Sequence, residues 1–210
     1  MTHSDRALVS PDCDSLSLTN KPPLKLGIMA SGSGTNFAAV AKAIADGKLN
    51  AEIKVLVYNN PDATVKLKAE KFQIPAVLLD NRQYKSREDL DRQIVATMQS
   101  YGVELIVMAG WMRIVTQTLL DGFPNRVINI HPSLLPSFKG IKAIEQALQA
   151  KVKITGCTVH FVSLAVDSGD IIIQAAVPVL ANDTPEILHQ RIQIQEHRIL
   201  PLAIAVWHGK

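Results

Sequence analysis

Short apolar runs alternate with amphipathic stretches over the first two thirds of the chain. The apolar runs have the length of buried strands and lie at residues 25–30, 53–58, 76–79, 105–109 and 127–130. Stretches with helical spacing of their apolar positions separate them, at residues 37–45, 62–72, 86–101 and 116–121. Strands that alternate with helices in this way favour a parallel sheet with right-handed crossovers.

The pattern changes after residue 131. A helix is predicted at residues 142–150, and strand-like segments at 155–163 and 170–177 are joined by a link short enough for a hairpin. The last helix is predicted from Thr184, as N-cap, to about His208, with a kink or break at Pro201. The predicted fold class is therefore α/β, a Rossmann-like, doubly wound, mostly parallel sheet followed by a C-terminal β-hairpin and helix.

Composition sets the N-terminal segment apart from the rest. Residues 1–23 are rich in Ser, Asp, Thr and Pro and lack an apolar pattern, so they are predicted to be a disordered or loosely attached tail. Residues 24–210 are predicted to form a single domain, because a chain of 210 residues suits one domain or one domain with a small lobe. The content of hydrophobic residues, 47%, and of charged residues, 20%, is ordinary for a globular protein.

Charge and hydropathy narrow the class of function. The net charge is +3 and no basic cluster stands out, so we expect no nucleic-acid partner. No apolar run approaches the roughly 18 residues of a membrane span, and the start of the chain does not resemble a secretory signal. Two cysteines are too few for a disulfide framework. These features predict a cytoplasmic enzyme without a membrane partner, and they leave both a monomer and a homodimer open.

The run Val127-Ile128, part of the predicted strand 127–130, leads into Asn129-Ile130-His131-Pro132. Asn129 and His131 are two residues apart, so in an extended chain both side chains point to one face. Pro132 cannot continue a sheet ladder, which places His131 at the carboxyl end of a strand, where open parallel sheets bind ligands. An amide donor and a titratable imidazole there suit acid–base chemistry. The alternative is a structural histidine that caps a turn.

A glycine-rich turn, residues 31–36, lies between the first strand and the first helix. Its backbone N–H groups and the helix N-terminus favour an anion, and Ser33, Thr35 and Asn36 add side-chain donors. Phe37 stands where a dinucleotide fingerprint needs a third glycine, and the turn lacks the lysine of a Walker loop. The turn is therefore predicted to hold one phosphate, the alternative being a tight turn that only packs the helix.

Other polar groups lie in loops that have structural alternatives. Residues 109–115 form an apolar loop after the fourth strand, and Asp167 lies at the predicted hairpin tip, where Asp, Ser and Gly are common turn residues. His160, in the strand before that tip, is predicted to be a core histidine, the alternative being a contact with the site. His189 and His197 have no third ligand nearby in the sequence, so no metal is proposed.

The segment from Asn129 to Pro136 resembles the active-site signature of the folate-dependent formyltransferases. The turn at residues 31–36, the loop at 109–115 and the run from Gly156 to Gln174 are also similar to segments of that family. The likeness extends from Lys25 to Trp207. Lys142 departs from it, because some relatives have a histidine there, and Asp170 stands where proline is frequent.

The resemblance implies a role for particular side chains. It implies that Asn129, His131 and Asp167 are catalytic. It implies ribotide phosphate and ribose contacts at Gly34, Thr35, Asn36 and Glu196, and folate contacts at Arg87, Met112, Arg113, Ile114, Val115 and Asn129. The implied reaction is transfer of formyl from 10-formyltetrahydrofolate, as co-substrate, to 5-phosphoribosylglycinamide in purine synthesis, without a metal.

Two related activities and one different class remain as alternatives. A methionyl-tRNA formyltransferase is expected to carry a further C-terminal domain. A 10-formyltetrahydrofolate hydrolase is expected to carry a second histidine at position 132 and an N-terminal regulatory domain, although the loop at residues 137–140 looks similar to that of the hydrolases. A non-catalytic folate or nucleotide binder would turn over neither substrate.

Overall fold

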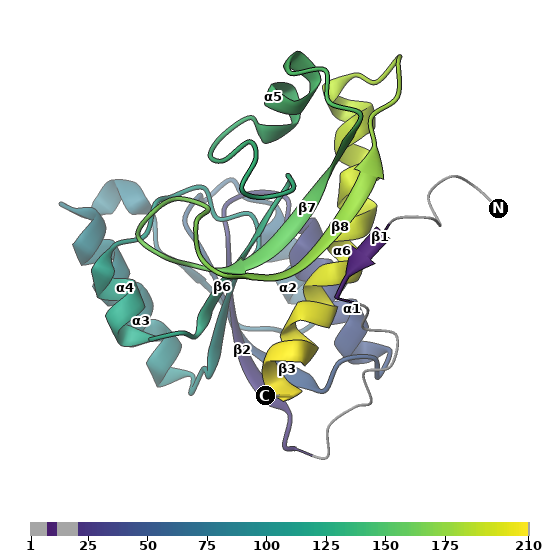
Figure 1. Cartoon of the computed structure of the whole chain (residues 1–210). Coiled ribbons are helices and arrows are strands. Elements are labelled where there is room, and N and C mark those ends of the chain that lie inside the picture. Colours follow the sequence, from purple (N-terminus) through teal and green to yellow (C-terminus); the bar gives the residue numbers. More distant parts are fainter. Residues whose placement is uncertain (1–7, 12–20, 210) are drawn as a thin grey trace. The chain divides into compact units, whose positions relative to one another are not determined.

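The computed structural model describes residues 8–11 and 21–209, and the chain divides into two compact units (Figure 1). One unit is Leu18–Asn129, and the other combines Met1–Ser17 with Ile130–Lys210. The strand β6, Val127–His131, is the place where the chain passes from the first unit to the second.

The unit Leu18–Asn129 is built on parallel strands. Its strands are β2 (Leu24–Ala30), β3 (Ala51–Tyr58), β4 (Ala76–Leu78), β5 (Leu105–Met108) and the start of β6, in the spatial order β6-β5-β2-β3-β4. The helices between them are α1 (Thr35–Ala45), α2 (Val65–Lys71), the 3-10 turn η2 (Asn81–Gln83), α3 (Arg87–Ser100) and α4 (Gln117–Gly122). The chain runs outward from β2 to β4 and then returns to β5 on the other side of β2. The loops after β2 and β5 therefore flank a topological switch point, the usual ligand position in such sheets.

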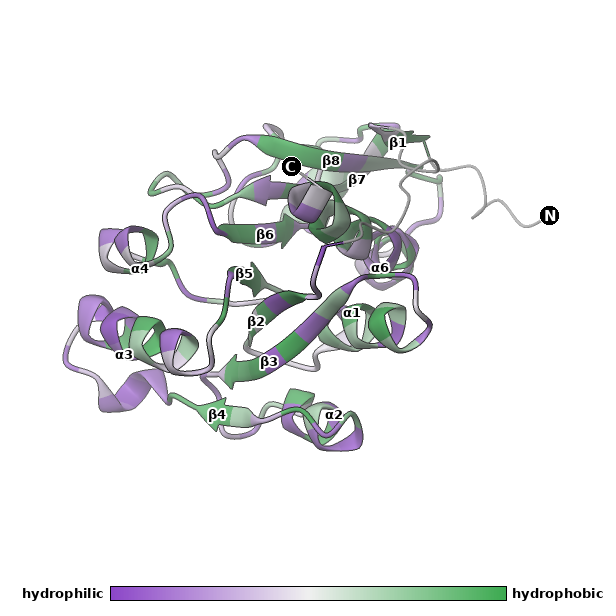
Figure 2. Ribbon diagram, turned by 90° about the horizontal axis from the view of Figure 1, so that it is seen from below, coloured by the Kyte–Doolittle hydropathy of each residue, from purple (hydrophilic) through white to green (hydrophobic). Residues whose placement is uncertain are grey.

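Burial on both faces explains why these strands read as continuous apolar runs. Leu26, Ile28, Leu56 and Ile106 are 0% exposed, and Phe37 of α1 packs edge-on against Phe72. Figure 2 shows the hydrophobic colour along β5 and over much of β3. Ser86 caps α3, since its Oγ accepts a hydrogen bond from the backbone N–H of Asp89 at 3.0 Å.

The second unit is organised around an antiparallel hairpin. Strands β7 (Ile154–Phe161) and β8 (Ile171–Pro178) pair along most of their length, and the long helix α6 (Pro185–Gly209) lies against both (Figure 1). The short helix α5 (Ala143–Gln149) contacts α6. A further strand, β1 (Leu8–Ser10), pairs with β8 on the edge away from β7.

The α/β class, the mostly parallel strand pairing and the C-terminal hairpin and helix are confirmed. Helix α6 continues through Pro201 rather than dividing there. Helix α2 begins three residues later than predicted, because Asp62 lies in a turn before the helix, where its backbone N–H donates to Asn60 Oδ1.

The N-terminal segment differs from its expected disorder at one place. Leu8–Ser10 form β1, while residues 1–7 and 12–20 lie outside the described part of the chain. Within the described residues, no helix has both the length and the apolar character needed to cross a membrane.

Candidate active site

His131 is the last residue of β6 and is 6% exposed. Asn129 lies two residues earlier on the same strand, so the alternation of an extended chain places both side chains on one face, as the sequence predicts. Pro132 follows at once and ends the strand. The carboxyl end of β6 thus presents an amide and an imidazole together.

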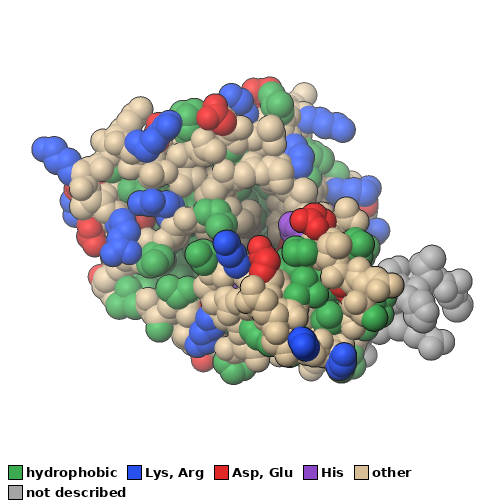
Figure 3. All heavy atoms as spheres, turned by 90° about the horizontal axis from the view of Figure 1, so that it is seen from above, with side chains coloured by type: hydrophobic (Ala, Val, Ile, Leu, Met, Phe, Trp, Pro, Cys, Tyr) green, Lys and Arg blue, Asp and Glu red, His purple; other side chains and the backbone are tan. Residues whose placement is uncertain are grey.

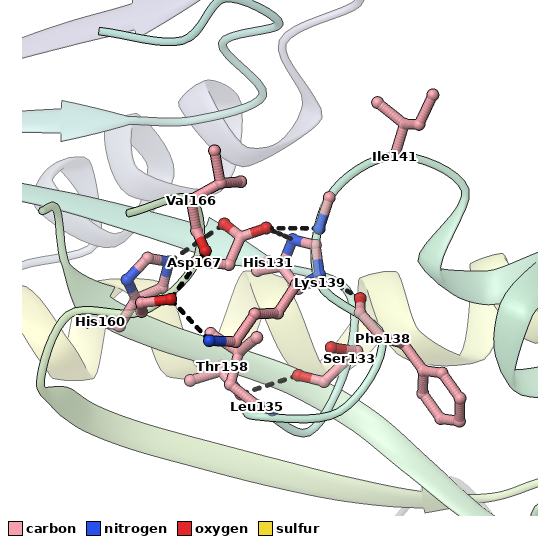
Figure 4. Close-up of polar contacts among 12 residues, drawn as sticks. His131, Ser133, Leu135, Phe138, Lys139, Ile141, Thr158, His160, Val166 and Asp167 are labelled. Carbon is pink, nitrogen blue, oxygen red and sulfur yellow. Dashed lines mark hydrogen bonds and ion pairs between the residues drawn. The ribbon is translucent and has the colours of Figure 1, made fainter. Parts of the chain in front are cut away.

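Asp167 lies between two histidine rings (Figure 4). Its Oδ2 atom is 3.3 Å from Nδ1 of His131, and its Oδ1 atom is 3.6 Å from Nε2 of His160. The three side chains are 10%, 7% and 2% exposed, respectively. The structure therefore brings together the two residues expected to act as a pair, and it places His160, predicted first as a core histidine and alternatively as a site contact, beside Asp167.

Each ring also faces a backbone carbonyl with its other nitrogen. His131 Nε2 is 2.9 Å from the oxygen of Phe138, and His160 Nδ1 is 2.7 Å from the oxygen of Phe161. A carbonyl only accepts hydrogen bonds, and a neutral imidazole has a single N–H. Only the imidazolium form of His131 can donate to Phe138 and to the Asp167 carboxylate at once.

The environment of Asp167 favours its ionised form. Partial burial alone would raise the pKa of this carboxyl group. The hydrogen bond from His160, the hydrogen bond from the backbone N–H of Gly140 at 2.8 Å and the charge of His131 outweigh it, so the pKa is lowered below its ordinary value. Asp167 is thus a fixed negative charge at neutral pH.

The loop after β6 contacts both members of the His131–Asp167 pair through consecutive residues. Phe138 supplies the carbonyl that faces His131, and Gly140 supplies the N–H that binds Asp167. Between them, Lys139 (labelled in Figure 4) donates through Nζ to Ser168 Oγ at 2.5 Å. Phe138 has φ +55° and Gly140 has φ +77°, a left-handed backbone that turns their polar groups inward.

A buried hydroxyl group fixes the first part of the same loop. Thr158 Oγ1, on β7, donates to the carbonyl of Ser133 at 2.7 Å and accepts from the backbone N–H of Leu135 at 3.1 Å. Gln174 of β8 donates to Thr158 Oγ1 and to the carbonyl of Leu135, both at 3.0 Å. The hairpin therefore holds the segment that follows His131 by side chains from both of its strands.

Gly169 is required by the turn that carries Asp167. A Cβ atom at this position would lie 1.8 Å from the carbonyl oxygen of Phe161, a backbone atom that cannot move aside. Asp167 itself has φ +49°, a conformation that Asp tolerates better than most residues. The spacing Asp167-Ser168-Gly169 is thus set by backbone geometry.

The predicted phosphate turn lies at the switch point of the unit Leu18–Asn129. Gly34, the N-cap of α1, has φ +70°, and a Cβ atom there would lie 2.2 Å from Val65 Cγ2. The turn is joined to the loop after β5, because Ser31 N–H donates to the carbonyl of Gly110 and Met112 N–H donates to Ser31 Oγ at 2.8 Å. Thr35 and Asn36 are the first residues of α1, so their N–H groups lie in its first turn.

The predicted folate residues are distributed over this unit. Met112 and Ile114 are 70% and 54% exposed, which leaves apolar surface for a ligand after β5, whereas Val115 is buried. Arg87 is exposed at the start of α3.

Glu196, the predicted ribose contact, lies on α6 in the unit of His131 and is 6% exposed. Its charge, together with burial as the larger cause, raises the pKa of the Cys157 thiol. This thiol is therefore unsuited to act as a nucleophile. Within the described ranges, no cluster of three His, Cys, Asp or Glu side chains is placed to hold a metal ion.

An α/β sheet with a paired histidine and carboxylate at a strand end defines an enzyme class that uses general acid–base chemistry. The chain belongs to the formyl transferase family, whose model matches residues 24–204.

Relatives and solved structures agree with this assignment. The phosphoribosylglycinamide formyltransferase of Bacillus subtilis is 39% identical over 86% of this chain and 92% of its own length. The trifunctional purine biosynthetic protein adenosine-3 of Gallus gallus is 42% identical over 89% of this chain, which spans only 18% of that protein. The glycinamide ribonucleotide transformylase 1 of Symbiobacterium toebii is 43% identical, with a TM-score of 0.86 and 91% of each chain covered.

Proposed function

We propose that this protein transfers the formyl group of 10-formyltetrahydrofolate to the primary amine of 5-phosphoribosylglycinamide, a step of de novo purine (IMP) biosynthesis. The observation that carries the proposal is the His131–Asp167 pair at the end of β6, in a chain that aligns over most of its length with an enzyme named for this reaction. The reaction needs acid–base groups and does not need a side-chain nucleophile.

The residues of β6 suit the first half of the reaction. The amine nitrogen attacks the formyl carbon, and the carbonyl oxygen gains negative charge. The Asn129 amide and the His131 imidazolium are donors for this oxyanion, and removing one such donor typically lowers the rate by about 10²–10³. When His131 acts through Nε2, substrate replaces the carbonyl of Phe138 as the partner of that nitrogen.

The second half of the reaction moves a proton. The attacking nitrogen loses a proton, the leaving nitrogen of the folate gains one, and the bond between that nitrogen and the formyl carbon breaks. Asp167 keeps the imidazole oriented and compensates its positive charge, as a carboxylate beside a catalytic histidine does. His160 on the other side of Asp167 offers a second carrier for the proton.

The remaining predicted residues divide between the two substrates. Gly34, Thr35 and Asn36 hold the ribotide phosphate at the N-terminus of α1, and Glu196 accepts hydrogen bonds from its ribose hydroxyls. The folate binds through Asn129 and the residues Arg87, Met112, Arg113, Ile114 and Val115. The exposed apolar surface of Met112 and Ile114 supports this assignment.

We further propose that the protein works in the cytoplasm as a monomer or homodimer on small molecules alone, without a metal, nucleic acid or membrane. On the face drawn in Figure 3, Lys and Arg side chains are interspersed with Asp and Glu rather than gathered into one basic patch. A surface of this kind is not typical of a nucleic-acid interface.

Hydrolysis of 10-formyltetrahydrofolate is the second candidate, because water in place of the amine would use the same groups. Two relatives that align along most of their own length are named as formyltransferases, and this favours transfer over hydrolysis. A coupled assay with and without the ribotide distinguishes the two activities. Folate turnover that requires the ribotide supports transfer, turnover without it supports hydrolysis, and no turnover under either condition supports a binding protein.

A further inference from the structure

Strand β1 occupies the outer edge of β8. The pairing is antiparallel, with Leu8 opposite Ala176, Val9 opposite Ala175 and Ser10 opposite Gln174. The strand β7 lies on the other edge of β8, so β1 turns what would be a sheet edge into an inner position of the hairpin unit.

The sequence of β8 makes its edge prone to pair with other molecules when no strand covers it. It reads Ile-Ile-Ile-Gln-Ala-Ala-Val-Pro, with no charged residue and with proline only at its end. Exposed edges that are long, apolar and uncharged pair readily with strands of other molecules, and native proteins usually blunt them with charges, proline or a covering segment.

The side chains of β1 bury little surface. Leu8 is 74% exposed, Ser10 is exposed and only Val9 is partly buried. The contribution of β1 is therefore mainly the pairing of backbone groups along β8 rather than an addition to the core. The strand also lies outside residues 24–204, the part matched by the family model.

We propose that β1 is an edge guard, a segment of this chain that occupies the β8 edge and prevents it from pairing with β8 of a second copy. The orientation of β1 supports this choice of partner. The edge accepts an antiparallel strand, and two copies of β8 related by a twofold axis are antiparallel to each other. Such pairing closes at the dimer, so removal of the guard yields a defined dimer contact.

The edge of β8 is connected to the active-site loop through Gln174. Its backbone is opposite Ser10 of β1, while its side chain holds Leu135 and Thr158. Pairing with β1 or with a second β8 keeps the backbone of Gln174 in a ladder, so the exchange of partners is expected to leave kcat within about twofold of the full chain. The assembly state and the activity are therefore separate readouts.

The experiment compares the full chain with a variant that lacks residues 1–11, by light scattering coupled to size exclusion over a wide range of protein concentration. The truncated variant is expected to reach twice the mass of the full chain as concentration rises. Ala176→Lys in the truncated background places like charges on the two β8 strands, and it is expected to restore the mass of the full chain.

Full-length variants keep the proposal testable if the truncated chain does not fold. Leu8→Pro removes the backbone N–H that β1 directs at Ala176 of β8, and is expected to speed hydrogen exchange at residues 174 and 176 without changing it in β2. Leu8→Ser, which alters an exposed side chain and keeps the backbone, is the matched control and is expected to change neither exchange nor mass. An unchanged mass for a folded truncated chain, or unchanged exchange at residues 174 and 176 in Leu8→Pro, would overturn the proposal.

Discussion

The Oδ2 atom of Asp167 lies 3.3 Å from Nδ1 of His131 and 2.8 Å from the backbone nitrogen of Gly140. One carboxylate oxygen thus joins the end of β6 to the loop that follows it. The other ring nitrogen of His131 faces the carbonyl of Phe138 in the same loop. The orientation of the His131 ring therefore depends on this oxygen of Asp167 and on that carbonyl.

Asp167→Asn keeps the size of the side chain and removes its charge, so kcat is expected to fall by at least about tenfold, within the range of acid–base contributions. KM for both substrates is expected to change much less, since the lost interaction belongs to the transition state. Steady-state kinetics with each substrate varied in turn measure the effect. A kcat equal to that of the unmodified protein would mean that Asp167 is only a turn residue.

The lowered pKa of Asp167 predicts a component of acid sensitivity in folding. A group with a lowered pKa in the folded state contributes stability that is fully present above its unfolded value, here near 3.8, and that is lost as the pH falls through the folded pKa. In urea unfolding below about pH 4, the free energy of unfolding of the unmodified protein is therefore expected to fall more steeply with acid than that of Asp167→Asn. Parallel curves for the two proteins would contradict this prediction.

The Lys139–Ser168 hydrogen bond is expected to help position the His131–Asp167 pair, because Lys139 lies between the two residues that contact that pair. Lys139→Met and Ser168→Ala are each expected to lower kcat by about twofold to tenfold, which corresponds to a net hydrogen bond of about 0.5–1.5 kcal/mol. The double variant is expected to be no worse than either single one.

Lys142→Met is the matched control for this cycle. It removes an exposed lysine from the same loop and is expected to leave kcat unchanged. If the losses of the Lys139 and Ser168 single variants add up in the double variant, the two residues act independently.

Gly34→Ala tests the turn before α1. The left-handed backbone and the close approach of Val65 are expected to destabilise the variant by at least about 1 kcal/mol, measured by urea unfolding. Because the turn is proposed to bind phosphate, Gly34→Ala is also expected to raise KM for the ribotide without a matching rise in KM for the folate. Gly32→Ala is the control, because no atom lies within 4 Å of the Cβ it would add. Equal changes in both KM values would refute the phosphate assignment.

Thr158→Val exchanges the buried hydroxyl group for a methyl group of similar size. The variant leaves the carbonyl of Ser133 and the N–H of Leu135 without this partner, so a loss of about 1–3 kcal/mol in the free energy of unfolding is expected. Thr155→Val on the same strand is the comparison, since the Thr155 hydroxyl has no hydrogen-bond partner among the described residues. A loss no larger than that of Thr155→Val would show that the hydroxyl network is unimportant.

The sequence was sufficient for the parts of the site that depend on local pattern. The alternation of an extended strand places Asn129 and His131 on one face, and the proline that follows ends the strand at the correct residue. Asp167 could be placed near His131 only through the resemblance to a family, because 36 positions of chain separate it from His131 and an Asp-Ser-Gly turn alone carries no such information.

The parts of the site made of backbone groups could not be predicted. The carbonyl of Phe138 and the N–H of Gly140 reach the pair only because both residues adopt positive φ angles. At Phe138 this angle is set by tertiary packing, because the residue type does not favour it. For His160, the apolar strand favours a core role, and a contact with the site is only the alternative, because its distance to Asp167 depends on the hairpin turn. Strand β1 escaped prediction because its three residues lie in a polar segment and pair with a distant strand.

The turn between β7 and β8 tolerates substitution at few positions. Gly169 admits no side chain, and Asp167 is tied to two histidines and a backbone N–H. Ser168 is exposed between them and contributes only a hydroxyl group. In a mutagenesis library directed at this turn, functional variants are therefore expected to differ at position 168 and to retain the residues on either side.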